Sequence, residues 1–273
     1  MVNQIISKCT FMKRVFNILV GLIIFATTIF AQSCTVNYGN NLKAGHYALV
    51  NGIQLYYEVY GSGEPLVLLH GNGGSINSFS NQIPYFAKYY QVIAIDSRLQ
   101  GKSGGSPDSI SYELMASDFC ALLDYLHIPS ANVLGWSDGG IDGIMMAMHC
   151  PDKVKKLAVS GANTVPDTTA ITNADLLGMK NFVAHPESAS KVAIALTQMM
   201  IDQPNILYSD LGKIQCPVLV MAGDHDMIKT EHTIKIYQSI PSASLCIFPD
   251  SNHGVCQQHP DLFNATVQSF LSK

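Results

Sequence analysis

The stretch that decides the fold is Asn132-Val133-Leu134-Gly135-Trp136-Ser137-Asp138-Gly139-Gly140. A short apolar run leads into a Gly-x-Ser-x-Gly motif, and residues 141–149 then have a helical pattern. This order predicts a strand, a sharp turn and a helix, with Ser137 at the apex. A serine hydroxyl is a weak nucleophile unless it is held exposed beside a base, and a sharp turn supplies that exposure. Gly135 and Gly139 would let strand and helix approach closely. The alternative is a glycine-rich structural turn.

A nucleophile in such a turn requires donors for an oxyanion, which a loop upstream can supply. The apolar run 66–69 leads into His70-Gly71-Asn72-Gly73-Gly74, where glycines would leave backbone N–H groups free to face an anion. We expect the two donors to be the amides of Asn72 and Asp138. A phosphate-binding loop would need Gly-Lys-Ser/Thr at the helix start, which is absent here. We expect His70 to brace the loop.

The same chemistry requires an acid and then a histidine downstream. A predicted strand at 217–222 leads into Gly223-Asp224-His225-Asp226, and another at 245–248 leads into a loop that carries His253. His253 would take the proton from Ser137, and the acid would orient the imidazole and stabilise its charged form. The rival bases are His225 and His259, and the acid is Asp224 or Asp226.

Composition bounds the class of protein. The chain has 273 residues, 48% of them hydrophobic, which is enough for the core of one large domain. The net charge is only -4, and no basic stripe indicates nucleic-acid binding. Metal-ligand spacing is absent, so we expect no metal and no cofactor. The cysteines are scattered, and we expect buried, unreactive thiols with at most one disulfide. They are Cys9, Cys34, Cys120, Cys150, Cys216, Cys246 and Cys256.

The amino terminus has the pattern of an export signal. Lys13 and Arg14 precede the apolar run 15–30, which is short for a membrane-spanning helix. We therefore assign residues 1–34 to a signal peptide or lipoprotein signal and exclude them from the fold.

Several endings of this signal are compatible with the sequence. Cleavage after Ala31 would release a soluble protein, whereas Ser33-Cys34 resembles a relaxed bacterial lipoprotein box in which Cys34 is lipidated. An uncleaved anchor is the third option. We expect an exported protein, periplasmic or extracellular, that contacts a membrane only through this segment.

Strand and helix patterns alternate through the rest of the chain, which favours a mostly parallel sheet. Asn51-Gly52 between two β-rich runs predicts a hairpin. Helices are expected at 79–89 and 112–127. Asp96 and Arg98, in the loop after the strand at 91–95, are expected to pair with each other.

The pattern changes between residues 164 and 215, which are helical, rich in methionine and punctuated by prolines. Because this segment lies between two core strands, we expect a small cap over the strand ends. Met179, Met199 and Met200 are candidates to line an apolar pocket beneath it, although ordinary helix packing would also explain each of them.

Together these motifs resemble the α/β-hydrolase superfamily. The resemblance implies a mostly parallel eight-stranded sheet flanked by helices, with a core of residues 45–163 and 216–273. Gly223-x-x-Asp226 matches the acid turn of that family, so Asp226 is carried over as the acid. In the loop 96–103 Leu99 stands where the family has a glycine, which puts the local shape of that loop in doubt. Because Ser137 occupies the nucleophile position, the family members that use an aspartate nucleophile are disfavoured.

The run Gly-Trp-Ser-Asp-Gly-Gly-Ile at 135–141 is similar to the biphenyl hydrolase-like members, which cleave α-amino acid esters. There the acid beside the nucleophile holds the substrate ammonium group, so Asp138 is a candidate for that role. Local hydrogen bonding within the turn would explain Asp138 equally well. Gly71 and Trp136 are further candidates for substrate contact.

We therefore expect a serine hydrolase that cleaves a small ester through an acyl-enzyme, with Ser137, His253 and Asp226 as the triad. A carbon–carbon bond hydrolase and a cofactor-free perhydrolase or haloperoxidase would use the same triad. A catalytically silent exported binding protein is the remaining alternative. The oligomeric state is open.

Overall fold

The computed structural model describes residues 36–273. The export signal predicted for residues 1–34, including Cys34, lies outside the described residues. Among the helices of the described part, none is long and apolar enough to span a bilayer. The five cysteines that lie within residues 36–273 are all free thiols.

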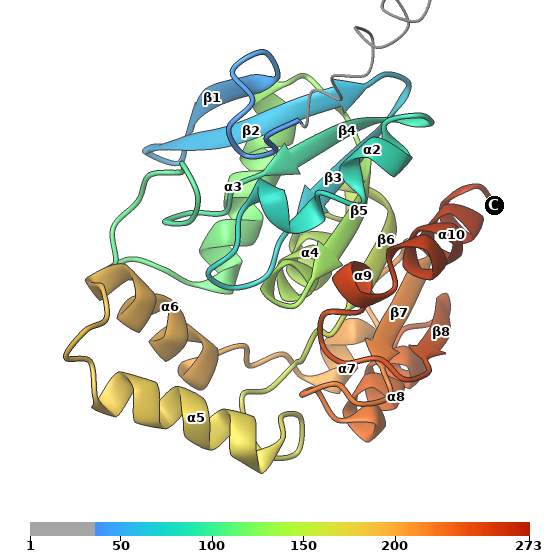
Figure 1. The fold of residues 1–273 in the computed structure, drawn as a ribbon. Coiled ribbons are helices and arrows are strands. Elements are labelled where there is room, and N and C mark those ends of the chain that lie inside the picture. The colour runs from blue at the N-terminus through green and yellow to red at the C-terminus, as the bar shows by residue number, and fades with distance from the viewer. Residues whose placement is uncertain (1–35) are drawn as a thin grey trace, which may run out of the picture. The chain divides into compact units, whose positions relative to one another are not determined.

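One eight-stranded sheet organises these residues (Figure 1), as predicted. Its order is β1-β2-β4-β3-β5-β6-β7-β8. β1 and β2 run antiparallel to their neighbours, and all pairs from β4 to β8 are parallel. The strands are β1 (Gly45–Val50), β2 (Ile53–Gly61), β3 (Glu64–Leu69), β4 (Tyr90–Ile95), β5 (Ala131–Trp136), β6 (Val154–Ser160), β7 (Val218–Gly223) and β8 (Ala243–Phe248).

The short apolar runs form strands because both faces of the sheet are covered. Side chains alternate between the faces, so Val67 and Leu69 enter one apolar cluster, and Leu66 and Leu68 enter the other. The predicted hairpin also forms at Asn51-Gly52, where both residues have positive φ, at 45° and 78°. Two positive φ angles suit the two-residue turn that joins antiparallel strands.

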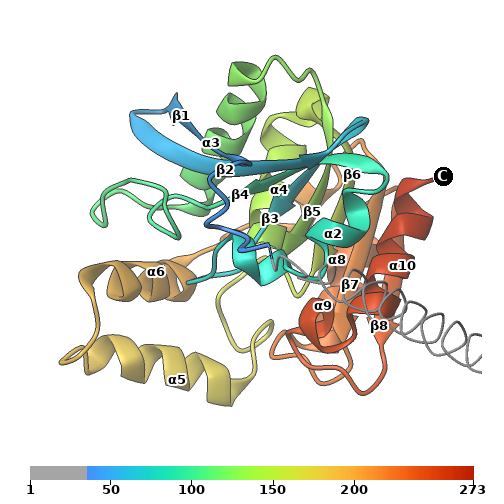
Figure 2. The same cartoon turned by 45° about the horizontal axis from the view of Figure 1, so that its top comes forward.

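Helices cover the two faces separately (Figures 1 and 2). The first cluster packs under α3, α4, α7 and α8, and the second under η1, α2, α9 and α10. The helices of the core are η1 (Ile76–Phe79), α2 (Ile83–Phe86), α3 (Tyr112–Tyr125), α4 (Asp138–His149), η2 (Pro151–Lys153), α8 (Thr230–Ser239), α9 (Val255–Gln258) and α10 (Pro260–Leu271).

The continuous helix expected at 79–89 is wrong. The segment forms a 3₁₀ turn, η1, and then a single α-helical turn, α2. Phe79, Ile83 and Phe86 are spaced like one helical face because all three are buried against the sheet. Hydrophobic spacing therefore reported burial correctly but did not report helix continuity.

The segment between β6 and β7 is helical. It contains α5 (Asn173–Ala184), α6 (Lys191–Asp202) and α7 (Tyr208–Leu211), and α5 and α6 lie beyond the ends of the central strands in both views (Figures 1 and 2). Its entry is fastened to the core by an isolated antiparallel bridge between Ile171 and Ile228. This attachment places α5 and α6 over the edge of the sheet at which the parallel strands have their carboxyl ends.

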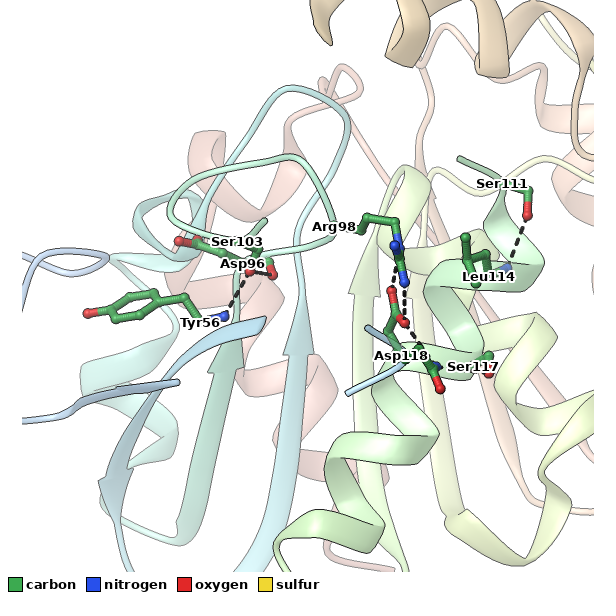
Figure 3. A network of polar contacts seen from close by, with 9 residues as sticks. Tyr56, Asp96, Arg98, Ser103, Ser111, Leu114, Ser117 and Asp118 are labelled. Carbon is green, nitrogen blue, oxygen red and sulfur yellow. Dashed lines mark hydrogen bonds and ion pairs between the residues drawn. The ribbon is translucent and has the colours of Figure 1, made fainter. Parts of the chain in front are cut away.

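The expected pair between Asp96 and Arg98 is wrong. Arg98 instead makes a two-pronged ion pair with Asp118 of α3, with Nε and Nη2 each 2.7 Å from a carboxylate oxygen (Figure 3). Asp96 accepts hydrogen bonds from the backbone N–H groups of Ile76 and Lys102. The loop keeps its left-handed turn at Leu99, where φ is 64°. A side chain is therefore tolerated at a conformation that favours glycine.

Removing one partner of the Arg98–Asp118 pair should be costly, because Arg98 would keep a buried charge without a partner. We expect Asp118→Asn to lower the free energy of unfolding by about 3–5 kcal/mol. Lys213→Met, which breaks the exposed ion pair with Asp210, should cost less than about 1 kcal/mol. Urea unfolding of both variants measures the difference. Equal losses would show that the buried pair does not stabilise the loop.

A second buried carboxyl group lies on α4, one helical turn after Asp138. Asp142 is fully buried, and neither side-chain oxygen has a hydrogen-bond partner among residues 36–273. Burial raises its pKa well above the ordinary value of 3.8, and the nearby charges of Asp138 and Asp118 raise it further. Asp142 therefore holds its proton more tightly in the folded chain than in the unfolded chain.

This pKa shift predicts a pH-dependent cost. The folded state loses stability as pH rises above 3.8 through the interval that ends at the raised pKa, with a slope approaching about 1.4 kcal/mol per pH unit. Asp142→Asn removes the titrating group, so the variant should gain stability over the parent between pH 5 and pH 8 and gain none below the ordinary pKa.

Chemical unfolding across this pH range tests the prediction, with the exposed Asp152→Asn as the matched control. A stability difference that does not change with pH would show that Asp142 is ionised without penalty.

Candidate functional site

The turn after β5 is strained as the sequence motif requires. Ser137 has φ 57° and ψ −122°, a conformation that few residues other than glycine adopt. A Cβ on Gly135 would lie 2.0 Å from the carbonyl oxygen of Gly139, and a Cβ on Gly139 would lie 2.0 Å from that of Leu69. Both positions therefore require glycine. The N–H of Ser137 donates to the carbonyl of Ser160, which ties the turn to β6.

Three side chains that are distant in sequence meet at this turn. The Nε2 atom of His253 lies 2.8 Å from Ser137 Oγ, and its Nδ1 atom lies 2.6 Å from Asp226 Oδ1. The Ile228 N–H also donates to Asp226 Oδ1, at 2.9 Å. Ser137, Asp226 and His253 follow the carboxyl ends of β5, β7 and β8, which lie at one edge of the parallel sheet.

The loop that carries His253 is held from two sides. Asp224, the alternative candidate for the acid, accepts hydrogen bonds from the N–H groups of Asp250 and Ser251. It therefore orders the His253 loop and does not contact the His253 imidazole. On the other side, the indole N–H of Trp136 donates to the carbonyl of His253, at 2.8 Å.

The other candidate histidines lie elsewhere. His225 is exposed beside Asp224, and the Nε2 atom of His259 lies near the carbonyl of Asp250. His70 is buried in the loop it was expected to brace: its Nδ1–H donates to the carbonyl of Gly71, and its Nε2 accepts from the N–H of Ser97. Burial lowers the pKa of His70 to about 4, so it is neutral at neutral pH.

A glycine at the end of β6 makes room for the imidazole. Gly161 has φ 65°, and a Cβ there would lie 2.8 Å from Cε1 of His253 and 3.2 Å from Oδ2 of Asp226. Sequence analysis did not single out Gly161 for this reason. The sequence predicts a strand at 156–161, and the place of Gly161 as the last residue of that strand was the local signal.

The amides expected to hold an oxyanion belong to residues near the Ser137 turn. Gly71 approaches so closely that a Cβ there would lie 2.9 Å from Ser137 Cβ, which brings the following residue, Asn72, to the same site. Asp138 is the first residue of α4, where backbone N–H groups point away from the helix and favour negative charge. Within residues 36–273 neither the Asn72 nor the Asp138 N–H donates a hydrogen bond.

The Asp138 side chain is buried beside the nucleophile. The side-chain amide of Asn72 donates to its Oδ2 at 2.8 Å and also reaches the carbonyl of Leu196 in α6, at 3.4 Å. Burial raises the pKa of Asp138 to about 6, and this rise is partly offset by Asn72, the Tyr112 hydroxyl and the charge of His253. A negative charge at neutral pH therefore lies directly behind Ser137.

These groups open into a cavity of about 40 Å³. Of the candidates from sequence, Ser137, Asp138, His253, Met179 and Met200 line it. Gly71, Trp136 and Met199 do not: Gly71 packs against Ser137, Trp136 holds the His253 loop, and Met199 is buried in the core. The remaining lining residues are Tyr112, Asn163, Ile171, Met227 and Ile228.

The two polar residues missed by sequence analysis are Tyr112 and Asn163. Tyr112 begins α3, and Asn163 follows the end of β6. Their positions at the edge that carries Ser137 were a signal, but only packing brings them into the cavity. In the described part of the chain, no group of three or more His, Cys, Asp or Glu residues is arranged to hold a metal ion.

Comparison with known proteins agrees with this fold. Residues 64–185 match the family model described as alpha/beta hydrolase fold. The chain is 27% identical to the serine hydrolase BPHL of Homo sapiens, with 86% of this chain and 88% of that protein covered. It is 26% identical to the 2-hydroxy-6-oxononadienedioate/2-hydroxy-6-oxononatrienedioate hydrolase of Burkholderia vietnamiensis, with 90% and 99% covered.

Solved structures show the same fold. The enol-lactonase from Burkholderia xenovorans superposes with a TM-score of 0.70 at 22% identity, over 84% of this chain and all of that one. The thermophilic esterase from Thermogutta terrifontis superposes with a TM-score of 0.70 at 21% identity, over 84% and 98%. With the family model, the relatives and the eight-stranded sheet in agreement, the chain is a member of the α/β-hydrolase superfamily.

Proposed function

We propose that the protein is a serine hydrolase that cleaves a small carboxylic ester through an acyl-enzyme. The observation that carries this proposal is the continuous contact from Ser137 Oγ through the His253 ring to Asp226, with distances of 2.8 and 2.6 Å. A hydroxyl in contact with an imidazole, itself oriented by a carboxylate, is the arrangement that makes serine nucleophilic at neutral pH.

In the first half of the proposed reaction, Ser137 Oγ forms a bond to the ester carbonyl carbon while His253 Nε2 takes the hydroxyl proton. The carbonyl oxygen becomes an oxyanion, which the N–H groups of Asn72 and Asp138 stabilise. The carbon–oxygen bond to the alcohol then breaks, and His253 returns its proton to the departing alkoxide. Asp226 orients the ring and stabilises its charged form throughout.

In the second half, a water molecule takes the place of the alcohol. His253 accepts one of its protons as the water oxygen bonds to the acyl carbon, and the same two amides stabilise the second oxyanion. The bond to Ser137 Oγ breaks, the serine regains its proton from His253, and a carboxylic acid leaves. These steps consume only the ester and water.

A reactive organophosphonate tests this proposal directly. We expect a fluorophosphonate probe to label the parent protein at Ser137, and we expect Ser137→Ala and His253→Ala to lose labelling and at least about 10⁴-fold of kcat on p-nitrophenyl acetate. His225→Ala, which removes an exposed histidine near the acid turn, should retain both.

Absence of labelling in the correctly folded parent would favour a binding protein that kept the fold. Labelling without ester cleavage would favour the other chemistries of this triad. Carbon–carbon bond hydrolysis is one of these chemistries. A perhydrolase would need peroxide and an organic acid.

The buried carboxylate of Asp138 favours an ester that carries a positive charge near its carbonyl, such as an amino acid ester. Asp138 lines the cavity directly after Ser137, and no cation pairs with it among residues 36–273. An ammonium group on the carbon next to the ester carbonyl would lie within reach of this charge and would compensate it.

The preference for such a substrate should depend on the ionisation of Asp138. We expect kcat/KM for an alanine ester to exceed that for the matching propionate ester by about 10- to 100-fold at pH 7.5, the range for a hydrogen bond between charged groups. Since Asp138 loses its proton as pH rises through about 6, this ratio should increase between pH 5 and pH 7.

Taking the ratio of the two substrates removes the contribution of His253, which acts on both. Asp138→Asn, an isosteric neutral variant, should give a ratio near one at every pH. Equal kcat/KM values of the parent enzyme for the two esters would show that Asp138 serves only local hydrogen bonding.

We also propose that residues 1–34 direct export, on the strength of the basic pair and apolar run in the sequence. This proposal is independent of the chemistry above. Mass spectrometry of the mature protein would distinguish cleavage after Ala31, a lipidated Cys34 and an uncleaved segment.

A further inference from the structure

The cavity beside Ser137 is small. Its free space is about 40 Å³, a few times the roughly 10–15 Å³ that admits one water molecule, so the cavity suits a short acyl group better than a long one. In the proposed mechanism, the acyl group is bonded to Ser137 Oγ from the first half-reaction until the second half-reaction releases it as the acid. The cavity around that oxygen therefore has to hold the acyl group, whereas the alcohol leaves.

Two isoleucines that line the cavity are held in place by backbone hydrogen bonds. Ile171 and Ile228 form the antiparallel bridge at the entry to α5, and both are almost fully buried. On either side of them, the Thr172 N–H donates to the carbonyl of Met227, and the Lys229 N–H donates to the carbonyl of Ala170. Because Ile228 also donates to the Asp226 carboxylate, moving these walls would disturb the acid.

Methionine side chains from three separate segments contribute to the apolar lining of the cavity. Met179 comes from α5, Met200 from α6 and Met227 from the turn after Asp226. Each is only partly buried, and methionine is flexible, so these side chains form the adjustable part of the wall. Tyr112, Asp138 and Asn163 contribute polar groups to the lining.

We propose that this cavity restricts the enzyme to esters of very short acyl groups, of the size of acetyl, propionyl, glycyl or alanyl, and that Met200 and Met179 set the size limit. This inference rests on the proposed acyl-enzyme mechanism. It follows from the isoleucine bridge, which is held by backbone hydrogen bonds, and from the methionine side chains that occupy space in the rest of the lining.

A series of p-nitrophenyl esters from acetate through propionate, butyrate and hexanoate measures the limit. We expect kcat/KM to be highest for acetate or propionate and to fall about tenfold for each methylene beyond the limit, the lower end of what one methylene contributes in an apolar pocket. Met200→Ala should raise the ratio of hexanoate to acetate at least about tenfold. Met200→Phe should shift the preference the other way and lower the rate on propionate relative to acetate.

Met199→Leu is the matched control, because Met199 precedes Met200 on the same helix but is buried in the core and does not line the cavity. It should leave the chain-length profile unchanged. Met179→Ala, on the exposed helix α5, repeats the widening test should Met200→Ala not fold.

Two outcomes would overturn the inference. One is a parent profile that rises or stays level through hexanoate. The other is folded Met200→Ala and Met179→Ala variants that both keep the parent profile. Loss of fluorophosphonate labelling together with inactivity on every ester would instead reject the acyl-enzyme mechanism itself, so the two failures are distinguishable.

Discussion

The structure depends on one close approach of backbone to backbone, between β5, the turn at Ser137 and the first turn of α4. Side chains at Gly135 or Gly139 would lie 2.0 Å from a carbonyl oxygen, so the approach exists only without them. It forces Ser137 into a strained conformation and lifts its hydroxyl out of the sheet. The sheet and helices that bury both faces of β5 supply the free energy that maintains this strain.

The parallel arrangement of the sheet then determines where the other groups meet. β5, β7 and β8 end at one edge, so the segments that follow them converge although the residues are up to 116 positions apart. Convergence alone would leave no room for the imidazole. Gly161, at the end of the intervening β6, provides that space, and Asp224 and Trp136 hold the His253 loop from two sides. The geometry around Ser137 is therefore a property of several strand ends together.

Charge is distributed unevenly behind this site. The Asp118 carboxylate is paired with Arg98, whereas Asp138 has only neutral hydrogen-bond partners, and Asp142 is buried without any among residues 36–273. Carboxyl groups this close cannot all ionise cheaply in a buried environment. The consequence is a single uncompensated negative charge at a small cavity that isoleucine and methionine side chains also line, an arrangement suited to a compact cation with a short carbon chain.

The sequence by itself determined the eight strands, the nucleophile turn and the order of serine, acid and histidine, because apolar runs and glycine requirements are local properties of the chain. It also pointed to Met179 and Met200 as pocket residues. Tertiary structure alone decided that Arg98 pairs with Asp118, that Trp136 supports the His253 loop and that the predicted helix at 79–89 is interrupted. It also brought Tyr112, Asn163 and the Ile171–Ile228 bridge to the cavity. These contacts join residues that are distant in sequence and form only when the helices and strands pack together. Hydrophobic periodicity along the chain is a local property and does not predict them.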